Sequence, residues 1–184
     1  MADEWIDVLD QKGNPTHKKI LKSEAHKLGV FHQSVHLWLY TSTGNLLLQK
    51  RAPAKDTYPG LWDVSVAGHI SYQEAPMKAA LRESREELGI MLQESNLSFI
   101  GTFKSMMSPS DNIIDNEFHR IYISEFLGKI SELQLQKEEV SQVKLIPIKT
   151  LYAHVMSEHI SKEYVPHGTT YYNFILKEIT NKLK

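Results

Sequence analysis

The stretch from Gly68 to Ile90, GHISYQEAPMKAALRESREELGI, constrains the fold of this chain more than any other. Pro76 suits the first turn of a helix, because its missing N–H is not needed there. Good helix formers follow it, and Gly89 is placed to end the helix. Gly68 and an isolated Glu74 precede the helical pattern. The stretch therefore predicts a strand that turns into a single helix.

Three carboxylates of that helix share one face. Glu83, Glu86 and Glu87 stand at i, i+3 and i+4, which places their Cβ atoms about 5–6 Å apart. Like charges at this spacing repel, whereas a divalent metal removes the repulsion, and hard oxygen ligands suit Mg²⁺ or Mn²⁺. Mg²⁺ bound in this way usually works together with substrate phosphates. The pattern indicates a diphosphate-cleaving metal site, and its alternative is a solvated acidic face with i,i+4 charge pairs.

The wider frame favours the metal site. Gly68, five residues, Glu74, seven residues and the run Arg82–Ile90 resemble the Nudix box of the Nudix hydrolases. Ser84 departs from that pattern, because an aliphatic residue usually stands there and packs the helix against the sheet. The departure concerns local packing rather than the chemistry of the box.

The resemblance implies a role for each residue of the box. Glu83, Glu86 and Glu87 would be the metal ligands and the catalytic carboxylates. Gly68 would form a tight strand-to-helix turn and direct its carbonyl to the metal. Arg82 would hold a glutamate of the box in place through a charge-assisted hydrogen bond.

Two assignments stay open at this point. Glu74 either reaches the metal through water or faces the positive end of the helix dipole. The general base that takes a proton from the attacking water is Glu86, Glu87 or a carboxylate of a later loop. Glu138 and Glu139 form the later pair, and their alternative is a solvated entry to a strand.

A second resemblance covers more of the chain. The type I isopentenyl-diphosphate isomerase branch of the same superfamily is similar at Asp3–Leu9, His26, His32, Trp38, Gln49–Ala52, Pro59–Asp63 and Ser65–His69. That branch holds a transition metal with three histidines and two acidic residues. The resemblance implies a possible second metal site here, at His26, His32, His69, Asp115 and Glu117. Imidazoles with carboxylates suit Zn²⁺, Mn²⁺ or Fe²⁺, although scattered histidines are also common as surface or core residues.

Position 67 separates this chain from the isomerases. They protonate and deprotonate carbon with a cysteine just before the Gly-His pair, whereas this chain has Ala67 there and no cysteine anywhere. The isomerases have also lost much of the acidic box, which this chain retains. Both differences favour hydrolysis.

Cations and further histidines could complete the site. Lys50, Arg51 and Lys55 lie on a loop that resembles the phosphate-gripping side of these enzymes, and the alternative is a solvated basic loop. His36 and His119 alternate with strand residues, so each is either a core histidine or a residue of the same cleft.

Composition bounds the remaining possibilities. A length of 184 residues with 41% hydrophobic and 23% charged residues fits one domain over residues 1–184, with an N-terminal strand extension over about 1–30. The net charge of −1 provides no excess of basic residues for binding nucleic acid, and no apolar run approaches the length of a membrane span. The acidic N-terminus lacks the pattern of a signal peptide, so we expect a cytoplasmic location.

The order of the elements predicts an α+β fold, and the Nudix resemblance sharpens it to an α/β/α sandwich with a mixed sheet between helices. We expect strands at Glu4–Leu9, His32–Tyr40, Leu46–Lys50, Asp63–Ala67, Leu97–Ser105, Glu117–Phe126 and Val140–Ile146, and helices at Thr150–Ser157 and about 169–183. The last helix either caps the fold or contacts a second subunit, so a homodimer stays open.

The predicted function is that of a Nudix hydrolase, a pyrophosphohydrolase that uses Mg²⁺ or Mn²⁺. Its partner would be a small-molecule diphosphate, either a nucleoside diphosphate derivative or another organic diphosphate. The alternatives are an isomerase-like enzyme acting on prenyl diphosphates and a non-catalytic module that binds a nucleotide. Metal-dependent turnover of a diphosphate separates the enzymes from the module.

Overall fold

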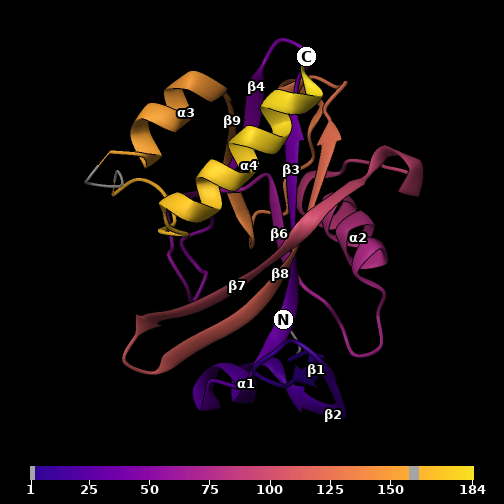
Figure 1. Cartoon of the computed structure of the whole chain (residues 1–184), viewed down its shortest axis with the longest axis vertical. Helices are drawn as coiled ribbons and strands as arrows, with labels where there is room; N and C mark the ends of the chain where they lie inside the picture. Colours follow the sequence, from indigo (N-terminus) through magenta and orange to yellow (C-terminus); the bar gives the residue numbers. More distant parts are fainter. Residues whose placement is uncertain (1–2, 158–161) are drawn as a thin grey trace.

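A mixed β-sheet between helices forms the centre of the molecule in a computed structural model that describes residues 3–157 and 162–184 (Figure 1). The strands are β1 (Trp5–Leu9), β2 (Pro15–Leu21), β3 (His32–Tyr40), β4 (Asn45–Arg51), β5 (Trp62–Asp63), β6 (Val66–His69), β7 (Ser98–Ser110), β8 (Ile113–Glu125) and β9 (Val140–Pro147). The helices are α1 (Lys22–Leu28), α2 (Pro76–Leu88), α3 (Ile148–Val155) and α4 (Thr169–Lys182), with 3₁₀ turns η1 (Glu94–Asn96) and η2 (Ile130–Glu132).

The main sheet has seven strands in the order β5-β4-β3-β8-β7, with β6 pairing to β3 and β9 to β4. β3 and β8 run parallel, and the other pairs are antiparallel. β1 and β2 form a separate hairpin that lies with α1 at one end of the molecule (Figure 1). This arrangement confirms the predicted sandwich with a mixed sheet.

Each face of the sheet buries its own apolar cluster. Leu37 of β3 packs with Ala80 of α2 on one face, whereas Trp38 packs with Ile175 of α4 on the other. The two faces alternate along β3 because successive side chains of a strand point to opposite sides. α2 therefore covers one face, and α3 and α4 cover the other (Figure 1).

The face that α4 covers changes character along β3 and β8. Toward the carboxyl ends of these strands it is apolar, and toward their amino ends it carries buried polar side chains: His32, Ser34 and His36 on β3, and Asp115, Glu117 and His119 on β8. The parallel register places His32 opposite Glu117 and Ser34 opposite His119. Buried polar groups need partners, so a stripe of them beside an apolar core indicates a functional cleft.

The structure confirms several expected elements. α2 begins at Pro76 and ends at Gly89, whose φ of 71° and N–H bond to the Arg85 carbonyl close the helix. The helices expected near positions 150 and 171 are α3 and α4. In the described part of the chain, no helix is long and apolar enough to cross a membrane.

Three expectations about strands need correction. β2 was not expected, because its sequence PTHKKIL is polar and its burial is partial. The strand expected at Asp63–Ala67 is two short strands, since β5 pairs with β4 and β6 pairs with β3. β7 and β8 extend as one long hairpin beyond the expected boundaries, which brings Asp115 and Glu117 onto the same strand.

Candidate active site

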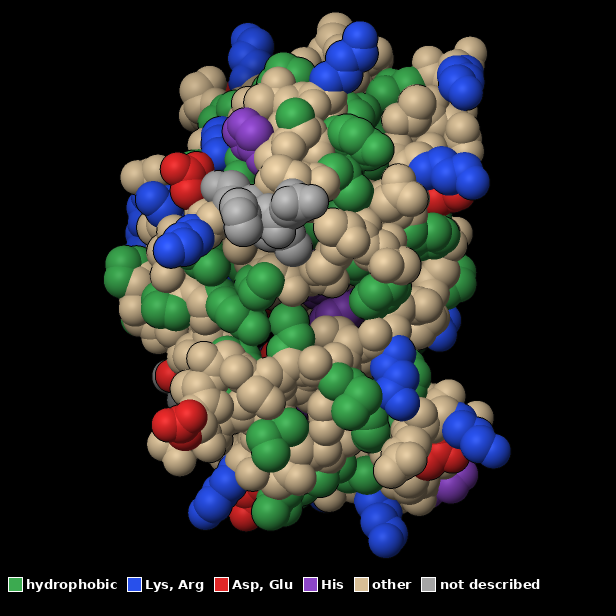
Figure 2. Space-filling view, turned by 60° about the vertical axis from the view of Figure 1, so that its left-hand side comes forward, with side chains coloured by type: hydrophobic (Ala, Val, Ile, Leu, Met, Phe, Trp, Pro, Cys, Tyr) green, Lys and Arg blue, Asp and Glu red, His purple; other side chains and the backbone are tan. Residues whose placement is uncertain are grey.

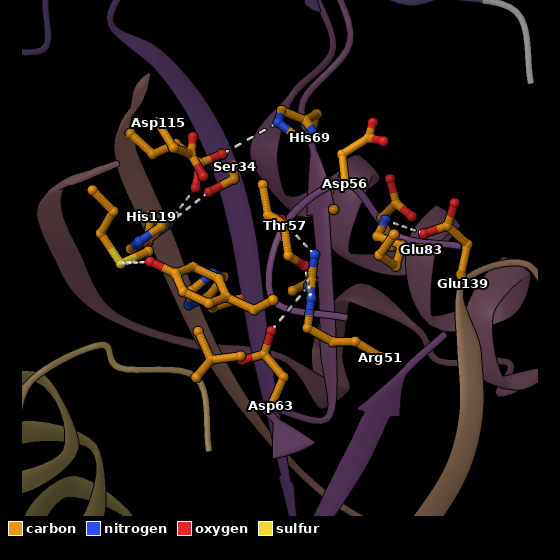
Figure 3. A pocket seen from close by; sticks show the side chains of 18 of the residues that line it. Ser34, Arg51, Asp56, Thr57, Asp63, His69, Glu83, Asp115, His119 and Glu139 are labelled. Carbon is orange, nitrogen blue, oxygen red and sulfur yellow. Dashed lines mark hydrogen bonds and ion pairs between the residues drawn. The ribbon is translucent and has the colours of Figure 1, made fainter. Parts of the chain in front are cut away.

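One cavity collects side chains from elements that are far apart in the sequence. Its lining includes His36 of β3, His69 of β6, Glu83 and Glu87 of α2, Glu117 and His119 of β8, the loop after β4, and His167. In Figure 3, Ser34 and His119 lie on one side of this cavity, and Glu83 and Glu139 lie on the other. Figure 2 shows a histidine side chain at the bottom of a narrow opening in the molecular surface.

Gly68 lets a box carboxylate lie against the sheet. A Cβ atom at Gly68 would stand 2.1 Å from Cδ of Glu83, so only glycine leaves room for that carboxyl group. Gly68 lies within β6, opposite Val35, and the sharp backbone of the following connection is at Gln73, with φ of 61°. The expectation that Gly68 forms the turn is therefore wrong, and the close approach of Glu83 explains the glycine instead.

Glu83 and Glu87 both line the cavity, Glu87 as a buried carboxylate and Glu83 as a largely buried one with its side chain 12% exposed. Burial raises the pKa of Glu83 to about 7, against the lowering effect of Arg82. Burial and the charge of Glu83 raise the pKa of Glu87 well above its usual range, although the Ala67 N–H donates a 3.3 Å bond to Glu87 Oε2. Two carboxylates in this state favour either protons or a cation.

Arg82 organises the carboxylates around it. Its guanidinium donates to both oxygens of Glu74 at 2.8 and 2.9 Å, to Glu83 at 2.6 Å and to Glu86 at 3.1 Å. It also donates to the carbonyl of His69 at 3.1 Å. Arg82 thus joins the box helix to β6 and holds Oε1 of Glu83.

Glu86 lies outside this buried arrangement. The described residues that line the cavity include Glu83 and Glu87 but not Glu86, whose side chain is 43% exposed. Ser84, the residue that departs from the box pattern, is buried and donates to the carbonyls of Leu81 and Ile90. The small residue therefore fastens the end of α2 instead of packing against the sheet as an aliphatic residue would.

The carboxylate–histidine cluster consists of His26, His32, His69, Asp115 and Glu117. Its three imidazole rings have centroids 5.2, 5.2 and 5.3 Å apart. Three imidazoles that bind one metal tetrahedrally at about 2.0–2.1 Å have centroids roughly 5 Å apart. The even spacing therefore matches rings that surround a common point.

The carboxylates of the cluster point to the same place. Glu117 Oε1 lies 3.3 Å from Nε2 of both His32 and His69, and Asp115 Oδ1 lies 3.6 Å from Nε2 of His26. Among the described residues, His32 Nε2 and Asp115 Oδ1 are buried without a hydrogen-bond partner. His32 Nδ1 donates to the Val30 carbonyl at 2.9 Å, so Nε2, which faces Glu117, is the nitrogen available to a metal.

The electrostatics of the cluster also fit a cation. Burial and the charge of Glu117 raise the pKa of Asp115 to about 7, whereas burial and neighbouring His32 lower the pKa of His26 to about 4. Burial opposes ionisation of Glu117, but His32, His119 and His69 outweigh it and hold the pKa of Glu117 well below its usual range. Neutral imidazoles beside carboxylates are ligands for Zn²⁺, Mn²⁺ or Fe²⁺, so these residues could hold such an ion.

A second histidine group, the imidazole floor, consists of His36, His119 and His167. His36 and His119 are buried, as the core interpretation expects, and both also line the cavity. His36 Nδ1 bonds the Tyr171 hydroxyl at 2.6 Å, and His119 Nδ1 lies 2.8 Å from Ser34 Oγ. Burial lowers the pKa of His36 well below its usual range and that of His119 to about 4.

Sequence reasoning missed His167, which no motif marks. The chain before it runs beside β5, where the Val165 N–H donates to the Trp62 carbonyl at 2.9 Å. This pairing brings His167 Nε2 to 2.8 Å from Asp63 Oδ1. Only the tertiary path of the chain, more than a hundred residues after Asp63, could have revealed it.

The three predicted phosphate-binding cations have different surroundings. Arg51 donates to Asp63 at 3.1 Å and twice to Thr57, so it holds the loop that lines the cavity. Lys55 lines the cavity and pairs with Glu139. Lys50 is not among the described lining residues, and its ammonium lies 5.7 Å from the Trp62 ring centroid.

Two further lining residues bear on the open assignments. Lys22, which sequence reasoning did not single out, brings a cation from the start of α1 to the cavity. Glu139 lines the cavity and Glu138 does not, among the residues that the structure describes. Glu74 has both oxygens on Arg82 and lies outside the cavity lining, which is the position of a carboxylate that orients the arginine.

Comparison with known proteins gives consistent matches. The NUDIX domain family matches residues 30–167. Nudix hydrolase 3 of Arabidopsis thaliana is 39% identical over 171 residues, which is 91% of this chain but only 22% of that protein. An isopentenyl-diphosphate Delta-isomerase of Serratia proteamaculans is 32% identical over 127 residues, or 69% of each chain. The solved structure of DR0079 from Deinococcus radiodurans has the same fold, with a TM-score of 0.64 at 22% identity over 85% of this chain and 91% of that one.

Proposed function

Because this chain belongs to the Nudix family, and is a Nudix hydrolase, we propose that it hydrolyses the diphosphate linkage of an organic diphosphate with Mg²⁺ or Mn²⁺. The observation that carries the proposal is the pair of carboxylates Glu83 and Glu87, the second of them buried, in a cavity that also holds Lys22 and Lys55. Carboxylates suit a hard cation and ammonium groups suit phosphate oxygens.

The metal would be held by Glu83 and Glu87 and, as the box resemblance implies, by Glu86 and the carbonyl of Gly68. Their fit rests on the high pKa values of Glu83 and Glu87, because carboxylates that resist ionisation alone are relieved by a cation. A bound divalent ion neutralises phosphate oxygens and lowers the pKa of the attacking water.

The side chains around the ion would bind and orient the substrate. Lys55 and Lys22 would hold the terminal phosphate, and Arg51 would keep the lining loop in place through its bonds to Thr57. Glu87 or Glu139 would accept the proton of the water, because both line the cavity. Arg82 would fix Glu83 in the orientation that binding requires.

Hydrolysis is favoured over the isomerase alternative. Ala67 stands where the isomerases have their acid–base cysteine, and a methyl group cannot transfer a proton. The carboxylate–histidine cluster would be a second metal site, for a transition metal, that this chain shares with that branch. A non-catalytic nucleotide-binding module would not explain why Glu83 and Glu87 line the cavity together.

The test is a substrate panel with Mg²⁺ and with Mn²⁺, reading released phosphate and monophosphate. It includes nucleoside di- and triphosphates, nucleotide sugars, thiamine diphosphate and isopentenyl diphosphate. We expect Glu87→Gln to lower kcat by about 10²–10⁴-fold. Glu125→Gln, which changes an exposed glutamate at the end of β8, is the matched control and should match the wild type.

Glu86→Gln belongs in the same series. A loss as large as that of Glu87→Gln means that Glu86 turns toward the metal when the site is loaded. If Glu87→Gln keeps near-wild-type turnover with its fold intact, the metal assignment is wrong. If no compound of the panel is hydrolysed with either metal, the result would favour the binding module.

A further inference from the structure

The position of the proton on the His36 ring follows from a chain of buried hydrogen bonds. Nδ1 of His36 lies 2.6 Å from the hydroxyl of Tyr171, and the indole Nε1 of Trp38 donates to the same hydroxyl at 3.0 Å. All three side chains are buried, two on β3 and one on α4. The hydroxyl of Tyr171 therefore joins a nitrogen of Trp38 to a nitrogen of His36.

The chemistry of these groups fixes the direction of the hydrogen bonds. An indole nitrogen only donates, so the oxygen of Tyr171 accepts from Trp38. Burial raises the pKa of Tyr171 well above its usual range, so the hydroxyl keeps its proton. Among the described residues, Nδ1 of His36 is the only acceptor that this hydroxyl reaches. Tyr171 therefore donates to Nδ1, because the opposite direction would leave a buried O–H group without an acceptor.

The proton of the His36 ring then belongs to Nε2. A neutral imidazole carries one proton, and Nδ1 uses its lone pair to accept from Tyr171. A doubly protonated ring would also carry a proton on Nε2, so this placement does not depend on the charge of the ring. His36 thus presents an N–H donor at Nε2 and has no lone pair there for a metal.

This donor is open to the cavity. His36 lines the cavity, and within residues 3–157 and 162–184 its Nε2 has no hydrogen-bond partner. In the same part of the chain, the enclosed ring nitrogens without a partner include Nε2 of His119 but not Nε2 of His36. The two rings stack with centroids 3.9 Å apart, which restrains the orientation of His36. A ligand in the cavity can therefore meet a donor that is held in place.

His36 also stands close to a carboxylate that is proposed to hold the metal. It lies directly opposite Ala67 in the pairing of β3 with β6, and such opposite residues have Cβ atoms about 4.5–5.5 Å apart on the same face. The N–H of Ala67 donates to Oε2 of Glu87 at 3.3 Å. In Figure 3, His119, on which the His36 ring stacks, lies across the cavity from Glu83. A diphosphate bound through a metal at Glu87 would therefore lie near the donor of His36.

We propose that His36 is a catalytic residue that donates its Nε2–H to an oxygen of the diphosphate, and that Tyr171 and Trp38 are positioning residues that keep the proton on that nitrogen. The inference rests on the proposed diphosphate hydrolysis and deepens it by adding a fixed donor to the two lysines of the cavity. Phosphate oxygens accept hydrogen bonds, and a preorganised donor stabilises the negative charge that they carry as the P–O bond breaks. The proton stays on His36 throughout, so the ring keeps its charge.

A measurement of the tautomer tests this placement without turnover. In the ¹⁵N spectrum of the histidine-labelled protein, Nδ1 of His36 should have the chemical shift of an unprotonated nitrogen and Nε2 that of a protonated one. His36→Gln identifies the signals by removing them. A protonated Nδ1 with an unprotonated Nε2 in the wild type would overturn the inference.

Two neighbouring tyrosines provide a matched pair of variants. Tyr171→Phe removes the hydroxyl that orders the ring, so the His36 signals should change to those of mixed tautomers. With the compound of the panel that is hydrolysed fastest, kcat/KM should fall by about two- to tenfold. Tyr172→Phe also removes one buried hydrogen bond, the 2.7 Å bond to the Val165 carbonyl, and should change neither quantity. Equal losses of kcat/KM in the two folded variants, with the tautomer of His36 unchanged, would overturn the role of Tyr171.

Substitution of His36 itself should have the larger effect. His36→Leu should lower kcat/KM by about 10- to 100-fold, because a hydrogen bond to a charged oxygen is lost. His36→Gln, whose amide can place an N–H group near the position of Nε2, should lose less than about tenfold. Thermal unfolding checks both variants, and the glutamine variant carries the test if the leucine variant does not fold. Near-wild-type kcat/KM in a folded His36→Leu protein would overturn the inference.

A probe that is not hydrolysed keeps this inference separate from the proposed function. Methylenediphosphonate with Mg²⁺ should shift the Nε2–H proton signal of His36 in the wild type. If no diphosphate is hydrolysed, the proposed function fails while this shift still tests the donor. An unchanged His36 signal, at a probe concentration that saturates the rise in melting temperature, would overturn the inference. A Zn²⁺ affinity that His36→Leu lowers by about tenfold or more would also overturn it, because Nε2 would then be a metal ligand.

Discussion

The carboxylate–histidine cluster and the imidazole floor both take side chains from β3 and β8, yet their geometries differ. Their members stand four residues apart on β3, at His32 and His36, and two apart on β8, at Glu117 and His119. In the first, ring centroids are 5.2–5.3 Å apart and two carboxylates face the common point. In the second, two rings stack at 3.9 Å.

The difference shows that the groups facing a histidine, and not its position on a strand, decide which ligand its ring nitrogens suit. Carboxylates lie inside the first group, where they add negative charge for a cation. In the second group Asp63 faces His167 Nε2 at 2.8 Å and Glu117 faces His119 Nδ1 at 3.3 Å, so each carboxylate holds one ring rather than a common point. Glu117 belongs to both arrangements, with Oε1 toward His32 and Oε2 toward His119.

The largest effect should come from removing one ring in each group and measuring a transition metal. His32→Ala should weaken Zn²⁺ or Mn²⁺ binding by at least about 100-fold, since losing a ligand costs more than losing its supporting partner. His36→Ala should change that affinity by less than about threefold, because its ring stacks on His119 with centroids 3.9 Å apart, closer than the roughly 5 Å of rings that share an ion. Competition with a chelating dye measures both. Equal losses in the two folded variants would mean that the groups act as one metal site.

A second difference is the response to pH. The pKa of Asp115 is raised to about 7 by burial and by the charge of Glu117, so in the metal-free protein the carboxyl holds a proton below that pH. Binding must displace this proton, so the affinity for Zn²⁺ should rise about tenfold per pH unit up to about 7 and then level off. Asp115→Asn, titrated with Zn²⁺ from pH 5.5 to 8, should flatten the slope.

The imidazole floor should lack that slope. Burial keeps the pKa of His119 at about 4 and that of His36 well below its usual range, so both rings stay neutral across the same pH interval. The contribution of His36 and His119 to ligand binding should therefore be constant from pH 6 to 8. A contribution that follows the metal affinity with pH would mean that the two groups act as one site.

The smallest effect is expected at Ser34, which lies between the carboxylate–histidine cluster and the imidazole floor. Ser34→Ala removes the 2.8 Å bond to His119 Nδ1, but Glu117 still faces that nitrogen. The free energy of unfolding should fall by about 0.5–1.5 kcal/mol, measured by urea denaturation, with Zn²⁺ affinity nearly unchanged. A collapse of Zn²⁺ binding in a folded Ser34→Ala protein would contradict the separation of the groups.

Several features of the fold and site were predictable from local sequence. Pro76 and Gly89 bound the box helix because their backbone restrictions act within a single turn. The strands around Trp38 and Tyr122 were predictable from their apolar and aromatic residues. Polar β2 was not, because its pairing with β1 supplies what its own sequence lacks.

In the candidate site, too, some features were predictable from local sequence and others were not. The spacing of Glu83 and Glu87 gave their shared helix face, but not the burial that raises their pKa values. The roles of Gly68 and Ser84 depended on what each touches, Glu83 in one case and the carbonyls of Leu81 and Ile90 in the other. A motif records spacing along the chain, and it carries no information about these contacts.

By itself, the sequence determined the box helix, its carboxylate face, the absence of cysteine chemistry and membership of the Nudix family. These follow from residue type and short-range spacing, which act before the chain folds. Only the tertiary structure decided that His167 meets Asp63, that Arg51 holds the lining loop and that the histidines divide into two groups. Such contacts join residues far apart in the chain, and burial then sets their charge, because removal from water changes the free energy of ionisation.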